Sequence, residues 1–203
     1  MLRHLSRFAV WLLVASSVRA QASLSVAPFV GYYRPLGHFA PASVLSTALP
    51  RTPSDLSGLA WGASLRSRPR QRVAVEAFAT TSESTLPGCL CPGGPTPSTR
   101  NRVTIAGAML QYDIAPSAAR TPLWLSAGPA MIRHSGDGYG RYGAPTDWGG
   151  AVGLDAEHAL ASQWRLVAGA KGVVYAFDLA FPPERGTQLD ALLSLRLEWH
   201  PGS

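Results

Sequence analysis

The chain has 203 residues, of which 46% are hydrophobic and 15% are charged, and its formal net charge is +6. This length suits a single domain, and all-β barrels of this size are common. Half of the charge excess is N-terminal, because without Arg3, Arg7 and Arg19 the chain has 15 basic and 12 acidic residues. So small an excess does not indicate a nucleic-acid partner, and we expect none.

Residues 1–22 have the pattern of a cleaved secretory signal peptide. Basic residues precede an apolar run at residues 8–14, and residues 20–22 are Ala-Gln-Ala, an A-x-A cleavage site. The apolar run is shorter than the roughly 20 residues that a membrane-spanning helix needs. We therefore expect the segment to be removed after export and residues 23–203 to form one folded domain.

The rest of the chain contains eight strand-like segments in which apolar and polar residues alternate. These segments are Leu24–Arg34, Gly58–Ser67, Arg72–Ser82, Asn101–Asp113, Pro122–His134, Asp147–Ala159, Gln163–Phe177 and Gln188–His200. The first, third, fifth and seventh connections span roughly 10 to 25 residues, and the others about 3 to 8. Outer-membrane barrels likewise combine short periplasmic turns with longer extracellular loops. The pattern predicts that all long connections lie at one end of an antiparallel barrel.

The segments are two-faced, because successive side chains of a strand point to opposite sides. One face of the last segment carries Leu189, Ala191, Leu193, Leu195, Leu197 and Trp199. The other face is dominated by Asp190, Ser194, Arg196, Glu198 and His200. The second, third and sixth segments alternate in the same way, whereas the fourth and fifth contain too much Ala and Gly to be oriented.

Tryptophans lie near the ends of the segments. They are Trp61, Trp124, Trp148, Trp164 and Trp199. All but Trp124, which lies in a segment without an oriented face, fall on apolar faces. Aromatic girdles at both ends of an apolar band are typical of the two interfaces of a membrane barrel. We therefore predict an all-β fold, an eight-stranded antiparallel up-and-down transmembrane β-barrel with its apolar faces towards lipid.

The barrel is expected to close, because lipid offers no hydrogen-bond partners to an open sheet edge. Eight strands leave a lumen that side chains can fill, so we expect a polar, self-plugged interior. Its inward charges predict an ion-pair network of Glu76, Asp155, Glu157, Arg165, Lys171, Arg196 and Glu198. A turn centred near Ala161 sets Glu157 opposite Arg165. Structural neutralisation is the favoured interpretation of the network, and an ion gate or proton path is the alternative.

Four arginines alternate around Pro69, at positions 66, 68, 70 and 72. They are interpreted as a solvated turn, with a phosphate-binding patch as the alternative.

Cys89 and Cys91 lie in the second long connection, in an exported and therefore oxidising setting. A disulfide between them closes a very small, strained ring, and two thiolates fall short of a four-ligand zinc site. A local or intermolecular disulfide and free cysteines both stay open. No metal site and no cofactor are expected.

The closing run from Leu193 to Trp199 alternates strictly and ends on an aromatic residue. Together with the eight segments, it resembles the small eight-stranded outer-membrane barrels, such as the OmpA transmembrane domain and the OmpX and OmpW groups. The resemblance extends from Leu24 to His200 and is architectural. It implies a barrel, expected to be a monomer, that contacts outer-membrane lipids and lipopolysaccharide and is inserted by the barrel-assembly machinery.

The expected function is non-enzymatic, with long extracellular loops that serve surface contacts or envelope integrity. The alternative is a lipid A- or phospholipid-acting enzyme, because His134-Ser135 invites comparison with outer-membrane lipid A deacylases and Asp137 could orient the histidine. Adjacent strand residues point to opposite faces, so His134 and Ser135 meet only where the strand is irregular. A second alternative is a soluble periplasmic, lipocalin-like binding barrel.

Overall fold

The computed structural model describes most of the chain beyond the first 22 residues. The described residues are 23–36, 57–86, 90–91, 94–95, 99–115, 121–136, 146–180 and 183–201. Within these ranges, no helix is long and apolar enough to cross a membrane. The expected signal peptide lies outside the described residues, so its cleavage stays a prediction.

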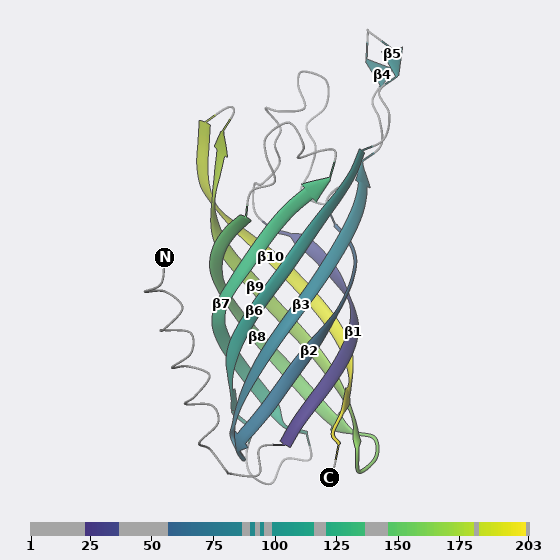
Figure 1. Ribbon diagram of the computed structural model, residues 1–203, viewed down its shortest axis with the longest axis vertical. Coiled ribbons are helices and arrows are strands. Elements are labelled where there is room, and N and C mark those ends of the chain that lie inside the picture. Colours follow the sequence, from purple (N-terminus) through teal and green to yellow (C-terminus); the bar gives the residue numbers. More distant parts are fainter. Residues whose placement is uncertain are drawn as a thin grey trace, which may run out of the picture.

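In the described part of the chain, eight long strands and one hairpin of two two-residue strands make up the regular structure (Figure 1). The long strands are β1 (Ser23–Pro35), β2 (Gly58–Arg70), β3 (Val73–Leu86), β6 (Thr99–Asp113), β7 (Leu123–Gly136), β8 (Thr146–Ala159), β9 (Trp164–Ala180) and β10 (Pro183–Trp199). The hairpin consists of β4 (Leu90–Cys91) and β5 (Gly94–Pro95), which pair with each other.

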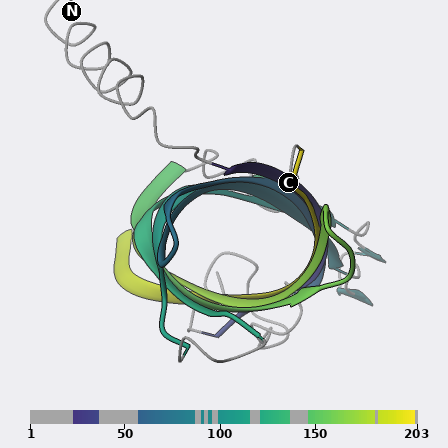
Figure 2. The ribbon, with the colours of Figure 1, turned by 90° about the horizontal axis from the view of Figure 1, so that it is seen from below.

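The eight long strands form one closed antiparallel barrel in the order β1-β10-β9-β8-β7-β6-β3-β2. The first and last strands join along most of their length, from Val26 opposite Trp199 to Pro35 opposite Asp190. Figure 2 shows the strands as an unbroken ring. The predicted fold class, an eight-stranded up-and-down transmembrane barrel, is confirmed, and closure removes the sheet edges that lipid could not satisfy.

The two ends of the barrel differ. One end, which we call the turn end, holds the start of β1, the end of β10 and the connections β2–β3, β6–β7 and β8–β9. The opposite end, the loop end, holds the connections β1–β2, β3–β6, β7–β8 and β9–β10 (Figure 1).

The predicted long seventh connection is wrong. β9 continues to Ala180 and β10 begins at Pro183, and these two residues face each other in the ladder. Charged residues at 178, 184 and 185 gave this stretch the composition of a loop. Beyond the apolar band a strand needs no apolar face, so the backbone ladder can continue through polar sequence.

Outward-facing side chains form an uncharged belt around the barrel, which we call the outer band. On each strand the belt covers nine or eleven residues, the length expected for a tilted membrane strand. Its stretches are residues 24–32, 59–67, 73–81, 104–112, 123–131, 148–156, 164–174 and 189–199. Large apolar side chains in it are solvent-exposed, including Leu59 at 79% and Trp148 at 71%. The outer surface of this barrel is therefore hydrophobic, as the alternation of apolar and polar residues predicted.

Candidate functional site in the barrel lumen

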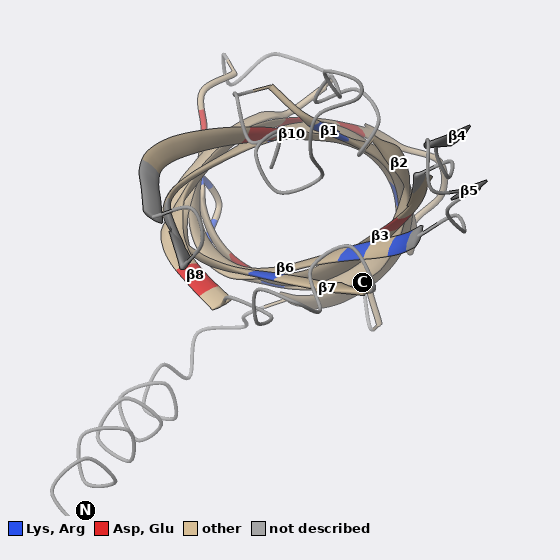
Figure 3. Ribbon diagram, turned by 90° about the horizontal axis from the view of Figure 1, so that it is seen from above, with Lys and Arg blue, Asp and Glu red and all other residues tan. Residues whose placement is uncertain are grey.

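Inward-facing side chains change character along the barrel axis. On β10, counted from the turn end, Glu198 and Arg196 come first, Leu192 follows, and Asp190 and Gln188 come last. From Glu76 on β3, Ser126 on β7 and Lys171 on β9 towards the loop end, the inward faces show the same order of polar, apolar and polar residues. The lumen thus has an ionic level, an apolar level and a second polar level, where the sequence had predicted a polar lumen throughout. Figure 3 shows the charged positions from the loop end, on several strands of the wall.

The ionic level is a cluster contributed by five strands, which we call the ionic cluster. Its members are Arg66, Arg68, Glu76, Asp155, Glu157, Arg165, Lys171, Arg196 and Glu198. All are buried except Arg68 and Arg165, which are partly exposed. Each charged group has an opposite charge within 4.0 Å. This pairing matters because an unpaired buried charge costs several kcal/mol.

The inner half of the ionic cluster centres on Arg196. Its Nη1 lies 2.5 Å from Glu76 Oε1 and its Nη2 lies 2.6 Å from Asp155 Oδ1, so one guanidinium bridges two carboxylates from different strands. Lys171 Nζ adds a second cation 3.3 Å from Glu76 Oε1. The side-chain amide of Gln111 donates hydrogen bonds to both Glu76 and Asp155. These contacts tie β3, β6, β8, β9 and β10 together across the lumen.

Arg66 connects the inner half to the mouth of the barrel. Its Nη1 donates hydrogen bonds to Glu198 Oε2 at 3.1 Å and Glu157 Oε2 at 3.2 Å. Its Nη2 lies 3.6 Å from Asp155 Oδ2 and 3.9 Å from Glu76 Oε2. One side chain therefore touches all four carboxylates of the cluster.

The interpretation of the arginines around Pro69 as a solvated turn is wrong for two of them. Arg66 is 2% exposed, and Arg68 Nη2 lies 2.6 Å from Glu157 Oε2, whereas Arg70 and Arg72 are exposed. The strand period of two continues through Arg66, which keeps the inward direction, and the β2–β3 register shifts only between Ser67 and Arg70. Arg68 lies within this irregular stretch and still reaches the lumen mouth, whereas Arg70 does not. The alternation of β2 was the available signal.

Trp124 corrects the predicted set of membrane-interface aromatics. It is 1% exposed and points into the lumen, where its indole N–H donates a hydrogen bond to Glu157 Oε2 at 3.1 Å. The guanidinium groups of Arg66 and Arg68 lie 5.6 and 5.1 Å from its ring centroid. A buried indole needs a partner for its N–H and stacks well with arginine, and the ionic cluster supplies both. Little in the Ala- and Gly-rich sequence of β7 revealed this orientation.

The β8–β9 hairpin is shifted from the predicted register. Arg165 faces Ala159 and Glu157 faces Val167, so Glu157 and Arg165 are diagonal neighbours and not direct partners. The Nη1 of Arg165 still donates a hydrogen bond to Glu157, because long side chains reach a diagonal neighbour. At the same mouth, His200 Nε2 lies 3.7 Å from Glu198 Oε1, and burial lowers the pKa of His200 despite this carboxylate.

Gly169 makes room for the ionic cluster. A Cβ atom at this position would lie 2.1 Å from Asp155 Oδ1 and 3.2 Å from Ser194 Oγ. Any side chain at this position therefore pushes Asp155 away from Arg196. The residue is required for a close approach, which alternation of polar and apolar residues does not reveal.

The apolar level closes the middle of the lumen. Its larger members are Phe29, Phe78, Ile105, Met109, Ile132, Val173 and Leu192, all buried. Two inward glycines admit the phenyl rings: a Cβ on Gly62 would lie 2.7 Å from Phe29 Cζ, and one on Gly107 would lie 2.8 Å from Phe78 Cε1. An eight-stranded barrel leaves room only for such side chains. The two polar levels are therefore separated by apolar packing that offers ions no partners.

The second polar level, towards the loop end, is organised around Asp190. Its carboxylate accepts hydrogen bonds from Tyr33 at 2.7 Å, Tyr175 at 3.0 Å and Gln188 at 2.7 Å. The Tyr175 hydroxyl also lies 3.2 Å from His134 Nε2. Sequence reasoning missed this group, because the pairing of Tyr33 with Asp190 depends on the register at which β1 joins β10.

The candidate deacylase residues do not meet. His134 is buried in the lumen with its Nδ1 3.8 Å from Asp147 Oδ2. Ser135 faces the other side of β7, and its hydroxyl lies 3.5 Å from the carbonyl oxygen of Arg102. Asp137 lies outside the described residues. The nucleophile and base that such chemistry requires within hydrogen-bond reach are thus on opposite faces of one strand.

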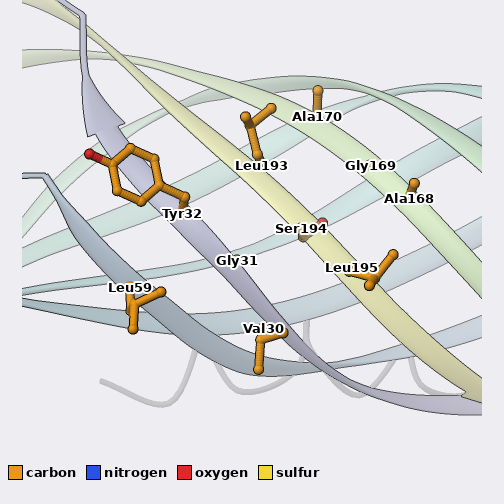
Figure 4. A pocket seen from close by; sticks show the side chains of 10 residues that line it. All are labelled: Val30, Gly31, Tyr32, Leu59, Ala168, Gly169, Ala170, Leu193, Ser194 and Leu195. Carbon is orange, nitrogen blue, oxygen red and sulfur yellow. The ribbon is translucent and has the colours of Figure 1, made fainter.

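The outer wall carries a shallow apolar groove of about 640 Å³. Figure 4 shows its lining from β2, β1, β10 and β9: Leu59, Val30, Gly31, Tyr32, Leu193, Ser194, Leu195, Ala168, Gly169 and Ala170. The lining is almost wholly apolar and belongs to the outer band. Its polar side chains are those of Tyr32 and Ser194.

The remaining predicted site residues are placed as follows. Trp61, Trp148, Trp164 and Trp199 are exposed on the outer wall, and the rings of Trp164 and Trp199 lie 6.5 Å apart at the turn end. Cys89 lies outside the described residues, so the loop disulfide with Cys91 stays a prediction. Among the residues that the structure describes, no group of His, Cys, Asp or Glu could hold a metal ion.

The fold is that of known small outer-membrane barrels. Neisserial surface protein A (NspA) matches with a TM-score of 0.61 at 16% identity, over 88% of this chain and 98% of that one. Outer Membrane Protein W of E. coli matches with a TM-score of 0.52 at 11% identity, over 90% and 99%. OprG of Pseudomonas aeruginosa matches with 0.50 at 10% identity, over 88% and 97%. No protein-family model and no curated protein matches the sequence.

These comparisons define the class of the protein. The chain is an eight-stranded transmembrane β-barrel of the small outer-membrane type, which confirms the architectural resemblance stated from the sequence. At these identities the likeness concerns the fold alone.

Proposed function

We propose that the protein is a non-enzymatic barrel of the bacterial outer membrane whose lumen is closed by its own side chains. Its turn end faces the periplasm, and its loop end faces outwards, where the long connections serve surface contacts or envelope integrity. It contacts outer-membrane lipids, is inserted by the barrel-assembly machinery, and acts as a monomer. The observation that carries the proposal is the apolar level between the two polar levels of the lumen.

Position in the membrane follows from the outer band. Its stretches of nine or eleven residues match a bilayer, and exposed aromatic side chains lie at both of its borders. A soluble, lipocalin-like barrel would instead bury its apolar faces and expose its charges. The ionic cluster inside this barrel is therefore an argument against the soluble alternative.

The ionic cluster favours structural neutralisation over an ion gate. All four carboxylates already have cationic partners, and the apolar level separates them from the loop end. A conduction path needs sites that ions can enter and leave, and packed apolar side chains do not supply them.

Reconstitution in planar lipid bilayers tests the closed lumen. The purified barrel is first shown to be folded by heat-modifiable migration, that is, by a different position on a gel before and after boiling. It is then expected to give no stepwise ion conductance. A large porin in the same bilayers is the positive control and gives conductance steps. Sustained steps from the wild-type barrel would refute the proposal. Release of the protein by osmotic shock without detergent would refute its membrane position.

The absence of enzymatic activity has its own test. Lipid A and phospholipid profiles are expected to be identical in cells that produce the wild-type protein and in cells that produce Ser135→Ala. A lipid species that depends on Ser135 would replace the structural proposal with the enzymatic one.

A further inference from the structure

Outward-facing arginines gather on one side of the barrel, just beyond the outer band at the loop end. Arg100 and Arg102 on β6 and Arg133 on β7 are all exposed. Arg102 faces Ser135 and Arg133 faces Thr104, so the two arginines are diagonal neighbours on adjacent strands, roughly 7 to 8 Å apart. We name these three residues the arginine patch.

One carboxylate accompanies the arginine patch and holds part of it in place. Arg102 Nε donates a hydrogen bond to Glu83 Oε1 at 2.9 Å, and its Nη2 reaches the same oxygen. Glu83 faces Arg102 across the β3–β6 ladder. The patch keeps an excess of two positive charges, because Arg100 and Arg133 are not matched by a further outward carboxylate on the described parts of β3, β6, β7 and β8.

A groove in the outer band adjoins the arginine patch on its β3 side, next to the Glu83–Arg102 pair. It has a volume of about 350 Å³ and is lined by Trp61, Gly62, Ala63, Ala79, Thr80, Thr81 and Thr104. Thr81 faces Thr104 one outward position below the Glu83–Arg102 pair. Its lining combines small side chains with the indole of Trp61. A cationic site at the level of the lipid headgroups therefore adjoins a groove at the level of the lipid acyl chains.

We propose that this face binds lipid A, the phosphorylated and multiply acylated glycolipid of the outer leaflet. A lipid A phosphate lies between Arg102 and Arg133, with Arg100 close by, and one acyl chain follows the adjoining groove. Guanidinium groups suit this task because they bind phosphate oxygens in pairs and are always charged. The inference rests on the proposed outer-membrane position, since only there does the loop end meet such a lipid.

The charge of the arginine patch and its position at headgroup level favour lipid A over other anionic lipids. Phosphatidylglycerol is also anionic, but it carries one phosphodiester and two chains. Lipid A carries phosphate groups and several acyl chains on one rigid headgroup. The phosphate groups match the three arginines, and an acyl chain matches the adjoining groove. Arg34, by contrast, is an outward arginine at the same end on β1 and lacks a basic neighbour among the described outward positions of β1, β2 and β10. It provides a matched control.

The test measures lipid A retained by the detergent-solubilised, full barrel by native mass spectrometry. The probes are bis-phosphorylated hexa-acyl lipid A, the same lipid without phosphates, and phosphatidylglycerol. The wild-type barrel is expected to retain the phosphorylated lipid at least about tenfold more than the other two. Arg100→Gln/Arg102→Gln/Arg133→Gln is expected to lose about tenfold or more of this retention, and Arg34→Gln to lose none.

Three results would overturn the inference: equal retention by the triple variant and the wild type, an equal loss in Arg34→Gln, or equal retention of phosphatidylglycerol. The dephosphorylated lipid tests the phosphate site on the wild-type chain, so the result remains interpretable even when the triple variant fails to fold. Failure of the proposed function is distinct, since it shows as a wild-type protein without heat-modifiable migration or membrane insertion.

Discussion

The Nη1 atom of Arg66 on β2 lies 3.1 Å from Glu198 Oε2 on β10, a contact that spans 132 residues of sequence and crosses over β1. It links the first hairpin of the barrel to its last strand inside the lumen. Arg66 also touches the other three carboxylates of the ionic cluster. The cluster therefore connects strands on both sides of the junction between β1 and β10, where the barrel closes.

The first prediction concerns Arg66. Replacement by Met keeps an unbranched stem and removes the guanidinium group with its charge, which leaves Glu157 and Glu198 with fewer cations in a buried setting. We expect Arg66→Met to lower the free energy of unfolding by about 3 to 5 kcal/mol, as for other broken buried ion pairs. Urea unfolding in lipid vesicles, followed by heat-modifiable migration, measures the change. The exposed Arg70→Met is the control and should leave the midpoint unchanged, whereas equal midpoints for all three proteins would contradict the role of the cluster.

A second prediction uses two glycines of the same strand. Gly169→Ala places a methyl group against Asp155 and disturbs its contact with Arg196, so we expect a loss of about 1 to 3 kcal/mol of stability. Gly172→Ala is the matched control, because a Cβ there meets Leu189 and Val152 only at 3.6 and 3.8 Å. The same urea series compares the two variants. A Gly169→Ala barrel as stable as Gly172→Ala would show that Asp155 is not confined as described.

The third prediction is a pH dependence at the mouth of the barrel. Burial lowers the pKa of His200, so the unfolded chain takes up its proton at a higher pH than the folded barrel does. The pKa of His200 in the unfolded chain is about 6.5. Its contribution to the free energy of unfolding is therefore complete above this pH and is lost as the pH falls below it. Between pH 7.5 and 5.5, His200→Gln is expected to lose less stability than the wild type. His158→Gln, on an exposed residue, serves as the control. A parallel loss in wild type and His200→Gln would rule out this contribution.

Much of the fold followed from local rules. Period-two alternation separated lipid-facing Leu189, Leu193 and Leu197 from inward Arg196 and Glu198, and connection lengths separated the two ends of the barrel. Both signals depend only on neighbours in sequence, so they survive without any knowledge of long-range pairing.

The interior depended on registers that the sequence does not contain. The Glu157–Arg165 contact was expected from the hairpin, but as a direct pair, because the turn centre was placed one residue too early. Trp124 could not be oriented, since Ala and Gly occupy both faces of β7. The contact of Tyr33 with Asp190 needs the closing register of β1 on β10, which only the assembled barrel defines.

The most direct test of an apolar exterior around an ionic lumen asks which tryptophans face lipid. Two single-tryptophan barrels, one with only Trp61 and one with only Trp124, are reconstituted in vesicles of chain-brominated lipid, which quenches indoles that touch the acyl chains. We expect strong quenching of Trp61, which is 62% exposed on the outer wall, and no quenching of Trp124 among the ionic side chains. Equal quenching of both tryptophans, or quenching of Trp124 alone, would contradict an apolar exterior around an ionic lumen.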